Sequence, residues 1–131
     1  MSGVSRVDDS ALMPEGIVYT EQKIRAFASL PVGWQHGEGH PPSDSTIEHA
    51  IILNIYASDL GFKETNAFPG IEGEVQLLIY HERTTLEITL EIDDSVTFIH
   101  EQDDKEIESI ENLTFCDTMK KLQFLKKQLC L

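Results

Sequence analysis

The chain has 131 residues, of which 40% are hydrophobic, and its 23 Asp and Glu against 10 Lys and Arg give a formal net charge of −13. This hydrophobic fraction excludes a wholly disordered chain, and the length suits one domain. The negative charge argues against direct binding to nucleic acid or to an anionic membrane surface, because both need Lys and Arg. The sequence shows neither an apolar run of transmembrane length nor the apolar core of a signal peptide, so we expect a cytoplasmic protein.

The first predicted helix begins at Thr20, which can cap its first turn, and ends before Pro31. Residues 1–18 show no hydrophobic periodicity, and we expect a flexible segment there, followed by one domain over residues 19–131. Residues 31–44 hold three Gly and three Pro, which predicts a loop.

A second helix is predicted from Ser45 to about Leu60. Ser45 and Glu48 have the spacing of a capping box, and Gly61 is well placed to follow the last turn. Apolar residues surround nearly the whole segment, which indicates a central, buried helix.

From Gly73 onwards the hydrophobic period changes to two, which predicts an antiparallel meander of three to four strands. Residues 101–112 are too acidic to decide between an edge strand and a helical turn. The predicted strand runs are residues 65–68, 75–80, 86–92 and 96–98.

The last predicted helix starts after Thr114 and carries an apolar stripe from Phe115 to Leu129. The stripe could cover the core or join two copies of the chain through residues 115–131. Cys116 lies on or near it and Cys130 lies 14 positions further on. A helix would hold the two thiols about 21 Å apart, too far for a disulfide, so we expect reduced cysteines and an inert, buried Cys116.

Together these elements predict an α+β fold, in which the meander packs against the central helix and is flanked by N- and C-terminal helices. The predicted core residues are Trp34, Ile47, Ile51, Ile55, Val75, Leu77, Ile79, Leu86, Ile88, Leu90, Val96 and Phe98.

Negative charge is concentrated in residues 72–111, which hold 13 acidic residues against Arg83 and Lys105, a local net charge of 2 − 13 = −11. We interpret this region as a docking surface for a basic protein, as in an inhibitor or an antitoxin-like protein, although a solvated, solubilising surface would look the same. No nucleophile elbow or phosphate-binding loop occurs, and we expect neither an enzyme nor a cofactor. The candidate partner-binding residues are Glu82, Glu87, Glu91, Asp93, Asp94, Glu101, Asp103 and Asp104.

The segment His36-Gly-Glu38-Gly-His40 offers an alternative, a metal-dependent enzyme. The intervening glycines prevent the helical spacing that puts two His on one face, so only a loop site is open to these residues. A third ligand would have to come from elsewhere in the chain. The candidates for it are His49, His81 and His100.

Residues 30–43 (Leu-Pro-x-Gly-Trp-x-x-Gly-x-Gly-x-Pro-Pro-Ser), followed by Ile47 and Ala50, resemble a loop-and-helix pattern in a family of small, uncharacterised bacterial proteins. The resemblance extends over residues 24–92 and implies a helix followed by alternating strands, with no established activity. His36, Glu38 and His40 stand where that pattern has Asp, Tyr and a small residue. Trp34 belongs to the shared pattern, and we expect it to close over the central helix, or else to anchor a partner.

Overall fold

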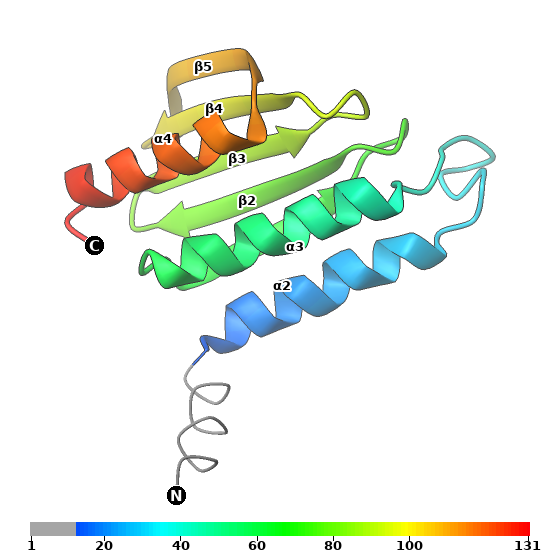
Figure 1. Cartoon of the computed structure of the whole chain (residues 1–131), viewed down its shortest axis with the longest axis horizontal. Helices are drawn as coiled ribbons and strands as arrows, with labels where there is room; N and C mark the ends of the chain where they lie inside the picture. Colours follow the sequence, from blue (N-terminus) through cyan, green and yellow to red (C-terminus); the bar gives the residue numbers. More distant parts are fainter. Residues whose placement is uncertain (1–12) are drawn as a thin grey trace, which may run out of the picture.

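The computed structural model describes residues 13–131, which form a five-stranded antiparallel sheet with its helices in front of it in the view of Figure 1. The strands are neighbours in chain order, β1-β2-β3-β4-β5, as in a meander. The predicted α+β class is confirmed, with five strands rather than three to four. The elements are α2 (Glu15–Ala26), the 3-10 turn η1 (Phe27–Ser29), α3 (Asp44–Asp59), β1 (Glu64–Pro69), β2 (Val75–His81), β3 (Thr84–Leu90), β4 (Val96–Gln102), β5 (Lys105–Leu113) and α4 (Phe115–Gln128).

The fifth strand, β5, lies where the sequence left a strand and a helical turn both open. It pairs with β4 as an edge strand, where charged side chains are tolerated and discourage pairing with other chains. Two irregularities in its register, one on each side of the Phe98–Ile110 pair, interrupt its alternation and leave Ile107 56% exposed. The charged side chains and the irregular register together conceal the period-two alternation of β5 in the sequence.

The three helices pack against the same face of the sheet, with α2 against β1, α3 against β2 and β3, and α4 against β4 (Figure 1). This face supplies every second residue of the central strands to the core. Ten of the twelve predicted core residues are buried, whereas Ile55 is half-buried beside the core and Trp34 lies outside it. Within residues 13–131, none of the helices is both long and apolar enough to cross a bilayer.

The first described helix, α2, begins at Glu15, five residues before the predicted start, and the predicted role of Thr20 is wrong. Pro14 is the N-cap residue, no side chain caps the helix, and the Pro14 carbonyl accepts from the amides of Ile17 at 3.0 Å and Val18 at 3.2 Å. Ile17 is completely buried in α2, although it lies within residues 1–18, for which the sequence predicts a flexible segment. Residues 1–12 of that predicted segment lie outside the described part of the chain.

The predicted capping box at the start of α3 is also wrong. Ser43, rather than Ser45, caps the helix, and its hydroxyl accepts a hydrogen bond from the Thr46 amide at 3.1 Å. Ser43 has the extended backbone that an N-cap residue needs, with φ −69° and ψ 160°. At the other end the prediction is confirmed, since Gly61 has a φ of +110° and follows the last turn.

A buried polar network joins α2, α3 and β1. Asn54, which is completely buried, donates from Nδ2 to the Ile17 carbonyl of α2 at 3.0 Å, and its Oδ1 accepts from the Thr65 hydroxyl of β1 at 2.7 Å. The Thr65 carbonyl in turn accepts from the hydroxyl of Thr20 at 2.8 Å. The network fixes α2 and α3 relative to the edge of the sheet.

The last helix, α4, has the predicted cap, because the Thr114 hydroxyl accepts from the Asp117 amide at 3.0 Å. Its apolar stripe packs on the core of its own chain, where Leu122 and Leu125 are buried. Cys116 is exposed, so its predicted burial is wrong: the residue lies beside the stripe and on its outer side.

His100, on β4, is a buried titratable group beneath α4. The residue is 9% exposed, and its Nε2 has no hydrogen-bond partner within residues 13–131. Glu108 faces it across the β4–β5 pair, and Lys121 of α4 forms an ion pair with Glu108. Burial lowers the pKa of His100, and Lys121 adds to this effect while Glu108 opposes it.

We therefore expect stability to fall as the pH is lowered through about 6.5, the pKa of an unperturbed His. The folded chain binds this proton less readily than the unfolded chain, so protonation favours unfolding, and the contribution is fully present only above that pH. Urea titrations above and below this pH should show a smaller change in the free energy of unfolding for His100→Leu than for the wild type. The exposed residue His36 provides the matched control, and an unchanged pH dependence in His100→Leu would contradict the prediction.

Candidate functional site

The second face of the sheet is covered by no helix within residues 13–131, and we call it the open face (Figure 1). Because side chains alternate along each strand, the residues that do not enter the core point to this face, and most of them are half-buried. The open face is formed by Glu64, Asn66, Phe68, Gln76, Leu78, Tyr80, Thr85, Glu87, Thr89, Thr97, Ile99, Glu101, Glu106 and Ser109.

Three of the predicted partner-binding carboxylates belong to the open face or its border. Glu87 lies at its centre, between Leu78 and Ile99 on the neighbouring strands, and accepts a hydrogen bond from the Gln76 side chain. Glu101 lies on β4, and Glu91 directly follows β3. Within residues 13–131, none of these three carboxylates is in an ion pair.

The other five predicted carboxylates lie at the two ends of the sheet. Glu82, Asp103 and Asp104 occupy the β2–β3 and β4–β5 turns, where Asp103 pairs with Arg83 at 3.4 Å. Asp93 and Asp94 occupy the β3–β4 turn at the opposite end. The structure thus distributes the eight predicted residues over one face and two ends, since consecutive hairpin turns alternate between the ends of a meander.

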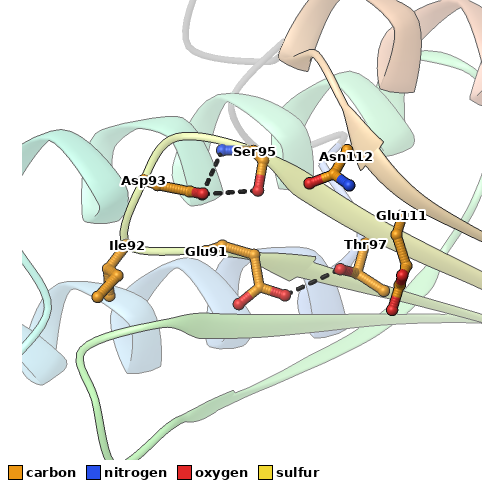
Figure 2. Close-up of a pocket in the computed structure, with 7 residues that line it drawn as sticks. All are labelled: Glu91, Ile92, Asp93, Ser95, Thr97, Glu111 and Asn112. Carbon is orange, nitrogen blue, oxygen red and sulfur yellow. Dashed lines mark hydrogen bonds between the residues drawn. The ribbon is translucent and has the colours of Figure 1, made fainter.

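A hollow of about 430 Å³ lies where the open face meets the β3–β4 turn (Figure 2). Thr97 lies between the carboxylates of Glu91 and Glu111, and its hydroxyl donates to Glu91 at 2.8 Å. The Ser95 hydroxyl and amide hold the pKa of Asp93 below its ordinary value. Thr97 and Glu111 belong to no sequence motif, and the pairing of β3 with β4 and of β4 with β5 brings them beside Glu91.

Apolar side chains give the open face a mixed character. Leu78 and Ile99 flank Glu87, and Tyr80 lies two residues beyond Leu78 on β2, on the same face of the sheet. Burial raises the pKa of Tyr80, and the charge of Glu64 on β1 adds to the effect. A partner would therefore meet aliphatic and aromatic groups between carboxylates.

Lys23 of α2 reaches round the β1 edge of the open face. Its Nζ lies 4.2 Å from the centre of the Phe68 ring and donates to Asn66 Oδ1 at 2.9 Å. This cation–π contact covers part of the Phe68 ring. The positive charge of Lys23 is thus placed at the edge of the open face and away from Glu87 at its centre.

The loop of His36, Glu38 and His40, the candidate metal site, does not bring metal ligands together. His36, Glu38 and His40 are all exposed, and the loop is held by backbone hydrogen bonds such as Gln35 N to Glu38 O at 2.7 Å. Within residues 13–131, no group of three or more His, Cys, Asp or Glu side chains is placed to hold a metal ion.

The three histidines considered as a further ligand lie elsewhere in the fold. His49 of α3 stacks on Phe115 of α4, with ring centres 4.8 Å apart. His81, at the end of β2, meets Phe62 edge-on, and His100 is buried on β4. These positions separate them from the loop.

Trp34 does not close over the central helix as predicted. Its ring is half-buried and packs within its own loop, and Nε1 donates to the His40 carbonyl at 3.3 Å. The ring lies against Gly39, where a Cβ atom would stand 2.8 Å from Nε1. The glycine-rich turn folds back on the ring, so that the loop supplies its own packing.

Comparison with known proteins places the chain in no group: no protein-family model, curated protein or solved structure matches it.

Proposed function

We propose that the chain is a non-enzymatic, cytoplasmic binding protein that holds a basic protein partner on its open face. An inhibitor or an antitoxin-like protein would act in this way, by occupying the surface with which a basic protein meets phosphates. The observation that carries the proposal is the uncovered sheet face whose central and bordering carboxylates, Glu87, Glu91 and Glu101, have no ion-pair partner within residues 13–131.

Two physical features support this use of the open face. Unpaired carboxylates attract a cationic partner and speed its association, because no cationic side chain within residues 13–131 forms an ion pair with them. The aliphatic groups of Leu78 and Ile99 beside Glu87 offer apolar area that a partner can remove from water.

The two exposed, unpaired cysteines fit the reducing compartment that the proposal assumes.

Reversing charge on the open face should weaken the complex. The immobilised full chain would first be used to capture partners from the host lysate at low and at moderate salt. The affinity of the captured partner should then fall about tenfold or more for Glu87→Lys/Glu101→Lys, and its salt dependence should become shallower. Isothermal calorimetry at two salt concentrations measures both quantities.

A matched control is available on the helix side of the molecule, where Glu48 and Asp59 of α3 are exposed. Glu48→Lys/Asp59→Lys makes the same change in net charge, and we expect it to change the affinity by no more than about twofold at moderate salt. Equal effects of the two double variants would contradict the proposal. Recovery of the chain alone at both salt concentrations would contradict it as well.

Self-association through residues 115–131 is the alternative. Because the stripe of α4 packs on the core, two copies would have to meet through its outer face, where Phe124 is 53% exposed. Light scattering of the wild type and of Phe124→Ser separates this alternative from a complex with another protein. Truncation before Phe115 would not, because it removes Leu122 and Leu125 from the core.

A further inference from the structure

Three hollows form a row at the end of the molecule that carries the 31–43 loop. Their volumes are about 340, 210 and 430 Å³. The first and second share Glu72 as a lining residue, and the second and third share Ile92. The third is the hollow of Figure 2, so the row leads from the loop to the border of the open face. We call this row the end groove.

The walls of the end groove are held together by the backbone. The His40 amide donates to the Ile71 carbonyl at 2.8 Å, which ties the loop to the β1–β2 turn. Gly73 of that turn is buried, and a Cβ atom there would stand 3.4 Å from the Pro41 carbonyl oxygen and 3.6 Å from Cγ2 of Ile92. The loop and two hairpin turns therefore meet in close contact, and the groove exists before anything binds.

Large aliphatic side chains are exposed along the end groove. Val32 is 74% exposed, Ile71 48% and Ile92 63%, and they come from the loop, the β1–β2 turn and the β3–β4 turn. Three such side chains around connected hollows are typical of an interaction surface rather than of isolated surface residues. Gly37, which lines the first hollow with Val32 and Ile71, leaves open space at its Cβ position, so that a bound chain can approach the backbone there.

The charged residues along the end groove are of one sign. No Lys or Arg is found among the described residues that line the three hollows. The complement of this pattern is a chain that carries positive and aliphatic groups together. The five lining carboxylates are Glu38, Glu72, Glu91, Asp93 and Glu111.

We propose that the end groove binds an extended segment of a basic protein in which Lys or Arg side chains alternate with aliphatic ones. In an extended chain, successive side chains point to opposite sides, so aliphatic groups can meet Val32, Ile71 and Ile92 while the cations stay near the carboxylates. The inference rests on the proposed function and names the segment of the partner that is recognised. Glu91 borders both surfaces, which allows one partner to occupy the open face and the groove.

The test is an NMR titration of the full, ¹⁵N-labelled chain with a capped octapeptide of alternating Lys and Val. Trp34 is the single Trp of the chain and packs against Gly39, which lines the groove, so its indole N–H signal reports on this end of the molecule. We expect saturable shifts of that signal and of the amides at Ile71 and Ile92. A peptide of alternating Lys and Ser has the same charge and should bind at least about tenfold more weakly.

Variants then assign the contacts. Glu72→Lys and Ile92→Ser alter exposed side chains, and each should weaken binding of the Lys-Val peptide by about tenfold, whereas Asp59→Lys should leave it unchanged. Circular dichroism confirms that each variant is folded.

Three outcomes would overturn the inference. Equal binding of the two peptides would show attraction by charge alone. Shifts confined to the open face, for example at Thr85 and Ile99, would overturn the groove and leave the proposed function standing. Absence of shifts at both surfaces, together with recovery of no partner from the lysate, would overturn both.

Discussion

Replacing Asn54 by Ala is expected to lower the free energy of unfolding by about 3 kcal/mol. The substitution removes a buried hydrogen bond to the Ile17 carbonyl and a part-buried one from the Thr65 hydroxyl, and it leaves a cavity in a completely buried position. Buried polar groups that lose their partners are costly because water cannot reach them. Urea unfolding followed by circular dichroism measures the change.

Asn66→Ala is the matched control, since Asn66 is half-buried on the open face and accepts from Lys23 and from the Ala67 amide. We expect it to cost no more than about 1 kcal/mol. Asn54→Leu separates volume from hydrogen bonding, because it fills the site without a polar group. A loss below about 1 kcal/mol for Asn54→Ala would show that the network does not stabilise the fold.

Gly39→Ala should release Trp34 and destabilise the 31–43 loop by about 3 kcal/mol. Gly39 has a φ of +105°, which side chains rarely adopt, and the added Cβ would stand 2.8 Å from Nε1 of the indole. The ring must move away and gain contact with water. We expect the emission of the single Trp to shift to longer wavelength and the thermal midpoint to fall.

Gly37→Ala separates backbone strain from the contact with the ring. Gly37 also has a positive φ, +89°, yet nothing stands within 4 Å of its Cβ position. Its cost should be that of the conformation alone, about 1 kcal/mol, with little change in emission. If both variants kept the emission of the wild type, Trp34 would not be held by Gly39, and the indole could not serve as the reporter of the end groove.

Elements with strong local signals could be predicted from the sequence. The alternation in residues 75–92 gave two central strands, Gly61 marked the end of α3, and Thr114 marked the start of α4. Each of these signals needs only neighbours in the chain. The start of α2 was missed because its first turn uses Pro14 and a buried Ile17, and neither is a sequence signal for a cap.

Surface sites were harder to predict, because they depend on which segments meet. The acidic stretch was visible as a composition, but the alternation of hairpin turns between two ends separates its carboxylates. Glu111 reaches the hollow beside Glu91 only through the irregular register of β5. Val32, Ile71 and Ile92 are distant in the chain and carry no motif, so nothing in the sequence joins them into one groove.

By itself the sequence determined the α+β class, the antiparallel meander, the central helix and the strong negative charge, because these follow from periodicity, composition and local capping. Only the tertiary structure decided that all three described helices cover one face of the sheet and leave the other open. It also decided that Asn54 links three elements and that Trp34 packs on its own loop. The physical reason is that these features arise from contacts between distant segments, whose free energy depends on the packing of the whole chain.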